Sequence, residues 1–202
     1  MTTTYTQRPD AAPRKRAAKK WAAFALAMGT AFGAAPLIPS TPASAATGTH
    51  DGSSSDKAAA SCYEVKQVNP SASSGTYWLY TPAMSGPAQF YCDQETDGGG
   101  WVMIGRGREG WETWSQGKGD QEKLKTRPRT AGDFDVVQAS HETVNGLLGG
   151  TAVSDLDDGI MVQRAWNHRG TAYQTVRMRF PKMRDFIWPF KSAHPVDVKF
   201  NR

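Results

Sequence analysis

The stretch Tyr91-Cys-Asp-Gln-Glu-Thr-Asp-Gly-Gly-Gly-Trp101 (YCDQETDGGGW) joins two short runs rich in aromatic and aliphatic residues, 88–92 and 101–105. Its three consecutive glycines suit a tight reversal, because glycine adopts the positive φ angles that most residues avoid. A third run of this kind, 75–81, comes before them and is bounded by serines and a proline. The pattern predicts three strands in an antiparallel meander, with a glycine turn before the last.

The amino terminus has the form of an export signal. Basic residues gather over 14–20, an apolar stretch follows over 21–38, and Ala43-Ser44-Ala45-Ala46 has the A-x-A form of a cleavage site. We expect cleavage between Ala45 and Ala46. The alternative is an uncleaved membrane anchor, but glycines and a proline interrupt a stretch that would need about 20 solidly apolar residues to span a bilayer. After cleavage we expect no membrane segment.

Cleavage changes what the charge of the chain means. The whole sequence holds 24 Lys and Arg against 19 Asp and Glu. Residues 1–45 hold six of these basic residues and one acid, so 18 of each sign remain. The basic excess belongs to the export signal rather than to a binding face, and no nucleic-acid partner is expected.

Two cysteines, Cys62 and Cys92, lie in the exported part. Because secreted proteins meet an oxidising environment, an even count predicts one disulfide between them. The alternative is two separately buried free thiols. Residues 46–61 lack aromatic and branched aliphatic side chains, which predicts a disordered linker, and the remaining 62–202 are expected to form one domain.

Further along, Ser140 has the position of a helix N-cap, and Gly149-Gly150 would end that helix. Runs 159–164 and 172–180 predict a hairpin, and 195–202 predicts another strand. Alternation along 172–180 places Val176, Met178 and Phe180 toward the core and Arg177 and Arg179 toward solvent. The segment 105–132 gives no firm prediction.

The paired cysteines, the triple glycine and Trp101 together resemble the signature of fibrinogen-related (fibrinogen C-terminal) domains, in a bacterial-type form YCDxxxxGGGW. The resemblance is strong over 62–105 and weak beyond. It implies an α+β fold, with an N-terminal subdomain containing a short antiparallel sheet and the disulfide, followed by part of a central mixed sheet. It also implies a secreted, lectin-like, non-enzymatic recognition domain.

The resemblance implies further features that this sequence does not show. The family's calcium loop, ligand pocket and second disulfide belong to its later subdomain, and the cysteines here end at Cys92. We therefore expect the chain to be incomplete at Arg202, with no cofactor in the residues given and any calcium held by a later part. Trp111 and Trp114, set among polar residues, are the candidates for stacking against a sugar ring.

Other motifs give weaker indications. Gly105-Arg-Gly-Arg-Glu-Gly110 matches G-x-G-x-x-G but lacks the βαβ context of a dinucleotide site. Asp155, Asp157 and Asp158 are close enough for a calcium loop, yet the full ligand pattern is missing, and a solvated turn is favoured. The four histidines are scattered, and no G-x-S-x-G elbow is present.

These observations favour a secreted module that binds glycans or protein surfaces outside the cell. Two alternatives stay open: an accessory module of a secreted enzyme whose catalytic part lies beyond residue 202, or a structural protein of the cell surface. The ligand and the oligomeric state do not follow from the sequence.

Overall fold

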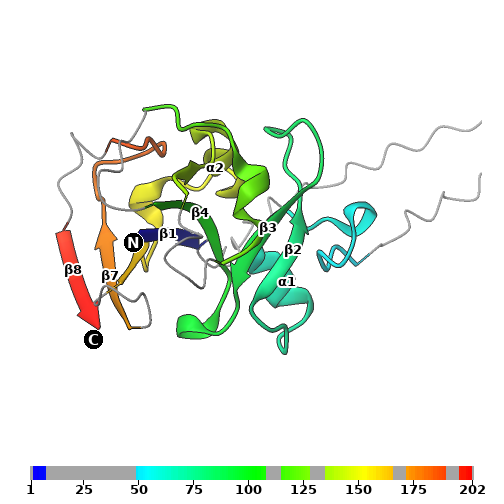
Figure 1. Cartoon of the computed structure of the whole chain (residues 1–202), viewed down its shortest axis with the longest axis horizontal. Coiled ribbons are helices and arrows are strands. Elements are labelled where there is room, and N and C mark those ends of the chain that lie inside the picture. Colours follow the sequence, from blue (N-terminus) through cyan, green and yellow to red (C-terminus); the bar gives the residue numbers. More distant parts are fainter. Residues whose placement is uncertain are drawn as a thin grey trace, which may run out of the picture. The chain divides into compact units, whose positions relative to one another are not determined.

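The computed structural model describes residues 2–7, 49–107, 115–127, 135–165, 172–189 and 196–201. All of them belong to one compact unit, Met1–Pro9 with Gly48–Arg202. Its strands and α-helices, in chain order, are β1 Thr2–Gln7, α1 Cys62–Val68, β2 Gly75–Leu79, β3 Ala88–Asp93, β4 Trp101–Gly107, β5 Val137–Gln138, α2 His141–Leu147, β6 Ile160–Ala165, β7 Tyr173–Arg179 and β8 Val196–Asn201 (Figure 1). Short 3-10 helices are η1 Ser55–Lys57, η2 Thr96–Gly98, η3 Gln121–Lys125 and η5 Val153–Asp155.

The strands form a single sheet in the order β2-β3-β4-β1-β6-β7-β8, and β5 pairs with β4. The predicted meander of β2, β3 and β4 and the predicted pairing of β6 with β7 are confirmed, as is the α+β class. The expectation of a mixed central sheet is wrong for the described strands, since every pair among them is antiparallel.

Strand β1 is an element that the sequence did not predict, as are helix α1 and the short strand β5. Residues Thr2–Gln7 lie in the middle of the sheet, between β4 and β6, and pair with both. The predicted signal peptide, residues 1–45, includes this strand, while residues 8–48, and with them the cleavage site, lie outside the described residues. Cleavage after Ala45 therefore stays a prediction, and the sheet described here is that of the uncleaved chain.

The segment before Cys62 also differs from its prediction. From residue 49 on, backbone hydrogen bonds fix what was expected to be a disordered linker. The Trp78 N–H donates to the Gly52 carbonyl at 2.8 Å, the Ala59 N–H donates to the Trp78 carbonyl at 3.0 Å, and the Tyr80 N–H donates to the Ala59 carbonyl at 2.8 Å. Ala59 is fully buried. Residues 49–61 are thus ordered by main-chain bonds to β2 rather than by apolar side chains, which is why composition alone did not reveal their order.

Helix α1 begins at a side-chain cap. The Ser61 hydroxyl accepts a bond from the Glu64 N–H at 3.1 Å, and the Glu64 carboxylate accepts one from the Ala60 N–H at 2.5 Å. The first bond satisfies an amide group that a helix leaves without a partner at its start, and the second holds the residue before the cap. The cap fixes the beginning of α1 at Cys62, the residue that carries the disulfide.

Helix α2 was predicted from its ends, and both are confirmed. Ser140 accepts a bond from the Thr143 N–H at 3.1 Å, and Gly149 and Gly150 have φ angles of 59° and 84°. Its apolar side chains, Val144, Leu147 and the following Leu148, are buried. No helix among the described residues is long and apolar enough to cross a bilayer.

Trp188 covers the middle of the sheet from an irregular segment, 181–189. It is 1% exposed, and its indole N–H donates to the Ala139 carbonyl at 2.7 Å. A Cβ on Gly105 would lie 2.4 Å from the Trp188 ring. The first glycine of the G-x-G-x-x-G match therefore serves the contact between β4 and this tryptophan.

Candidate functional site

The YCDQETDGGGW turn is held by Asp93, which is buried. One of its carboxylate oxygens, Oδ1, accepts bonds from the N–H groups of Glu95 at 3.1 Å and Thr96 at 2.9 Å. The other, Oδ2, accepts from the Thr96 hydroxyl at 2.7 Å. This carboxylate takes the place of a backbone acceptor inside the reversal, as aspartate does in turns of this kind.

The side chain of the neighbouring Gln94 joins two parts of the module. It is 1% exposed, its amide donates to the Cys62 carbonyl at 2.9 Å, and its side-chain oxygen accepts from the Gly100 N–H at 2.9 Å. A buried amide group is costly unless both its donor and its acceptor are used, and here each has a partner. Gln94 thereby links the start of α1 to the glycine turn beside the disulfide.

The three glycines are required by the backbone. Asp97, Gly98, Gly99 and Gly100 have successive φ angles of 47°, 87°, 83° and 84°. A Cβ on Gly99 would lie 2.3 Å from the Gln94 carbonyl oxygen, whereas one on Gly98 would meet nothing within 4 Å. Asp97 is the one described residue other than glycine with positive φ, a conformation that costs about 1–2 kcal/mol.

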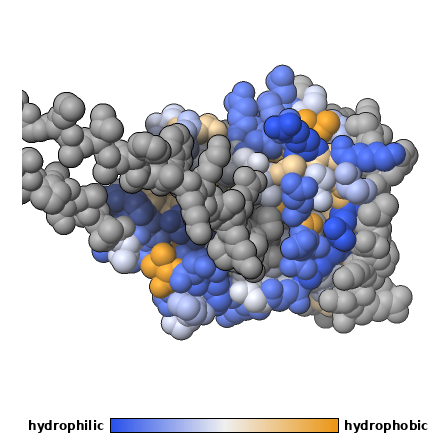
Figure 2. Space-filling view, turned by 180° about the vertical axis from the view of Figure 1, so that it is seen from behind, coloured by the Kyte–Doolittle hydropathy of each residue, from blue (hydrophilic) through white to orange (hydrophobic). Residues whose placement is uncertain are grey.

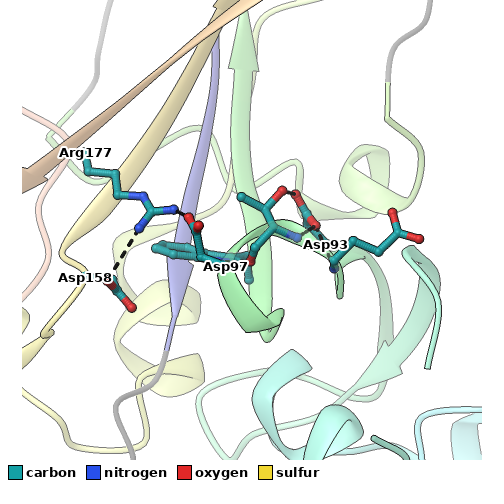
Figure 3. Close-up of polar contacts among 7 residues, drawn as sticks. Asp93, Asp97, Asp158 and Arg177 are labelled. Atoms are coloured by element: carbon teal, nitrogen blue, oxygen red, sulfur yellow. Dashed lines mark hydrogen bonds and ion pairs between the residues drawn. The ribbon is translucent and has the colours of Figure 1, made fainter. Parts of the chain in front are cut away.

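A charged cluster lies over this turn and connects it to β7. Figure 3 shows the Arg177 guanidinium between the carboxylates of Asp97 and Asp158. It forms an ion pair with Asp97, and its Nη1 lies 3.5 Å from Asp158 Oδ1. Its central carbon is 5.3 Å from the centre of the Trp101 ring, within range of a cation–π interaction.

The exposures in this cluster are unequal. The Arg177 side chain is 14% exposed, and those of Asp97 and Asp158 are 45% and 47% exposed. Burial lowers the pKa of Arg177 from its ordinary value. The arrangement is a sheltered cation with two carboxylates open to solvent, which we call the Arg177 cluster. Its carboxylates can accept hydrogen bonds from hydroxyl or amine donors of a ligand.

The prediction that Arg177 and Arg179 both face solvent is wrong for Arg177. Arg179 is exposed, but Arg177 lies between two turns that are distant in the sequence. Alternation along β7 shows which side of the sheet a residue is on, and it cannot show that another part of the chain covers that side. The acidic turns at Asp97 and Asp158 were each considered alone, so their convergence on one arginine was missed.

The remaining predicted residues have different outcomes. Cys62 and Cys92 form the predicted disulfide, with Cα atoms 5.5 Å apart. Trp111 and Trp114, the candidates for sugar stacking, and Ala45 and Ala46, at the predicted cleavage site, lie outside the described residues. In the described ranges no three His, Cys, Asp or Glu side chains come together as a metal site.

The surface offers few apolar contacts in the part of the chain that the structure describes. Figure 2 shows a mainly hydrophilic face on which apolar residues form small separate patches. The exposed large apolar residues are Val68, Tyr80 and Ile187, at 42%, 43% and 38% exposure. Single exposed apolar residues are normal for a protein surface and do not by themselves indicate an interface.

Comparison with known proteins supports the predicted family over part of the chain. Residues 59–126 match the family described as fibrinogen beta and gamma chains, C-terminal globular domain. The match includes the disulfide, the glycine turn and Trp101, and it extends beyond the 62–105 over which the sequence resemblance was strong. The bacterial-type form of the motif stays a prediction.

Individual relatives match over alignments of similar length. Human tenascin-N is 41% identical over an alignment of 70 residues that covers 31% of this chain and 5% of that protein. Mouse angiopoietin-4 is 36% identical over an alignment of 66 residues that covers 29% of this chain and 13% of that protein. Mouse tenascin-N is 40% identical over an alignment of 70 residues that covers 31% of this chain and 4% of that protein. No solved structure matches the chain.

Proposed function

We propose that this protein is exported and acts outside the cell as a non-enzymatic recognition module of the fibrinogen-related type, binding glycans or protein surfaces. The observation that carries the proposal is the folded module over 59–126, in which the family match, the disulfide and the glycine turn coincide. Two relatives that match part of the chain, tenascin-N and angiopoietin-4, are extracellular proteins whose fibrinogen-related modules serve recognition.

The disulfide supports the extracellular compartment. Disulfides persist in secreted proteins and are rare in the cytosol, where thiols are kept reduced. Cys62 and Cys92 are 1% and 0% exposed, and no free cysteine is present. A structural disulfide joining the start of α1 to β3 suits a chain that leaves the cell through the predicted export signal.

The Arg177 cluster is the surface that we propose for ligand contact. Asp97 and Asp158 each keep carboxylate oxygens open to solvent, and Arg177 holds both in place. Hydroxyl groups of a sugar, or amines of a protein surface, are suitable donors to such oxygens. Trp111 and Trp114 stay predicted as stacking residues for a sugar ring; Trp101 is fully buried and has no face open for that purpose.

Binding of the full chain to immobilised ligands tests the proposal. The purified protein is applied to a glycan array and to a panel of extracellular proteins, with and without a calcium chelator. We expect saturable retention on at least one ligand, weakened about tenfold by Asp97→Asn with Asp158→Asn, or about 1.4 kcal/mol. Asp185→Asn, an exposed carboxylate outside the cluster, is the matched control and is expected to bind normally.

Two results would contradict the proposal. One is an absence of retention across both panels by protein whose Cys62–Cys92 disulfide is intact. The other is hydrolysis of a substrate by the purified chain, which would make the module itself an enzyme. If the double variant is retained as strongly as the unchanged protein, the recognition function stands, but the ligand contacts a surface other than the Arg177 cluster.

A further inference from the structure

Strand β1 occupies a complete strand position in the middle of the sheet. On one side, Thr2 to Gln7 pair with β4 in a register that runs from Thr2↔Gly107 to Gln7↔Trp101. On the other side, Thr2 to Thr6 pair with β6 from Thr2↔Arg164 to Thr6↔Ile160. Among the described strands, β4 and β6 do not pair with each other, so β1 joins the two halves of the sheet.

The two strands beside β1 depend on it for their hydrogen bonds. All seven residues of β4 are buried, and on its other edge β4 pairs with β3 and β5 at only two positions each. In β6, Ile160 and Met161 are fully buried. Buried backbone groups need partners, because water cannot replace a lost bond in the interior. Removal of β1 would leave a row of such groups along both strands.

The position cannot close by simple contact of its neighbours. Because β4 and β6 are both antiparallel to β1, they run parallel to each other. Strands in a sheet are about 4.8 Å apart, so direct pairing of β4 with β6 would shift one half of the sheet by that distance and impose a new bonding pattern. An extended segment of another polypeptide restores the existing pattern without that shift.

The strand that fills the position comes from a removable part of the chain. Residues Thr2–Gln7 carry no charge and no proline, and four of the six are β-branched threonines, which suit a strand. They lie before the predicted cleavage site at Ala45, so cleavage would separate them from β4 and β6. The removal of β1 rests on the predicted export signal, whereas the position of β1 between β4 and β6 does not.

We propose that the space between β4 and β6 is a strand-acceptor site. Residues 2–7 fill it while they remain attached, and their removal opens it to an uncharged extended segment of about six residues from another polypeptide. The incoming strand runs antiparallel to both neighbours, as β1 does. Main-chain bonds on both edges supply the affinity, in the manner of recognition by strand addition.

Strand exchange in the full chain tests this site directly. A protease recognition sequence is inserted between Thr47 and Gly48, so that the chain folds whole and is cut afterwards. A biotin-labelled peptide of residues 1–9 is then added, and its capture is followed together with release of the fragment 1–47. We expect one peptide bound per chain, with binding that saturates. No capture is expected before the cut.

A proline variant of the peptide tests the strand geometry. Thr4→Pro removes a backbone donor from the middle of β1, and proline is not accepted inside a sheet. We expect this peptide to bind at least about tenfold more weakly. Equal binding of the two peptides would overturn the proposal. So would unfolding of the cut chain when the fragment leaves, or a fragment that never exchanges, since a site that cannot release its strand cannot accept another.

A disulfide lock supplies a second variant. Thr4 and Val162 are register partners, so Thr4→Cys with Val162→Cys is expected to crosslink in the full chain and to abolish peptide capture after the cut. Thr2→Cys with Val162→Cys, two positions out of register, is the matched control and is expected to leave exchange intact. Crosslinking in the control but not in the register pair would contradict the position of β1.

Discussion

The two halves of the sheet are held together by different means. In residues 59–107, strands that are neighbours in the sequence pair with each other, and the Cys62–Cys92 disulfide closes the region. In residues 160–201, β6, β7 and β8 also pair in order, but the region joins the rest of the sheet through β1. The first half is fixed by local contacts and one covalent bond, and the second by segments far away in the sequence.

The family match falls in the first half. The match covers 59–126, where side chains such as Asp93, Gln94 and Gly99 have roles that only a few residue types can fill. The second half is built from ordinary strand patterns, which many sequences can satisfy. Roles of this kind restrict the residue type at each position, whereas a strand pattern restricts only the alternation of apolar and polar residues.

The disulfide gives the largest expected effect and distinguishes the two halves. Replacing both Cys62 and Cys92 with serine should lower the free energy of unfolding by about 3–4 kcal/mol, because the bond closes a loop with a separation of 30 residues. Urea unfolding followed by tryptophan fluorescence measures this change. A loss below about 1 kcal/mol would show that the first half does not depend on its covalent bond.

The glycine turn gives the next effect, with a control one residue away. Gly99→Ala should destabilise the protein by about 3 kcal/mol, since it combines a positive φ with a Cβ 2.3 Å from the Gln94 oxygen. Gly98→Ala shares the positive φ but meets open space, and about 1 kcal/mol is expected. Thermal unfolding measures the loss of stability in both variants. Equal losses would show that the contact with the Gln94 oxygen does not contribute to the effect of Gly99→Ala.

Arg177 connects the two halves, so its removal tests their coupling. Arg177→Met should cost about 1–2 kcal/mol through the lost cation–π contact and ion pairs, the latter being weakened by the exposure of both carboxylates. Arg179→Met, at the exposed neighbour, should stay within about 0.5 kcal/mol. Chemical denaturation of both variants checks the difference. Similar losses of unfolding free energy at the two positions would show that the contacts of Arg177 contribute no more to stability than those of an ordinary surface residue.

Asp97 should give the smallest effect, because two contributions oppose each other. Asp97→Gly removes the cost of a positive φ, about 1 kcal/mol, and also removes an exposed ion pair worth up to about 1 kcal/mol. The net change is expected within about 0.5 kcal/mol, measured by urea unfolding. Asp97→Asn keeps the side-chain size and loses the charge, and a loss above 2 kcal/mol in either variant would show that the ion pair dominates.

Local signals in the sequence predicted much of this fold. The structure contains the strands predicted from aromatic and aliphatic runs, the hairpin of β6 and β7, and the Ser140 cap of α2. These features depend on interactions within a few residues or between neighbouring strands. The Ser61 and Glu64 spacing typical of a helix start was also present in the sequence, but Ser61 was assigned to the predicted linker because of the polar composition before Cys62.

The remaining features depend on contacts that sequence patterns do not contain. Arg177 was placed in solvent because its strand alternates, and its two acidic partners lie in separate turns. Strand β1 was included in an export signal because its neighbours in the sequence have that composition, while its neighbours in the sheet are about 100 and 160 residues away. The candidate site arises where distant segments meet, so its arrangement did not follow from patterns along the chain.

Intact mass of the chain recovered from the medium of cells expressing the full sequence tests the central claim most directly. The account predicts the mass of residues 46–202, lowered by two hydrogens for the Cys62–Cys92 disulfide. Retention of residues 1–45 in the recovered chain, or two free thiols without added reductant, would contradict an exported module held together by that bond.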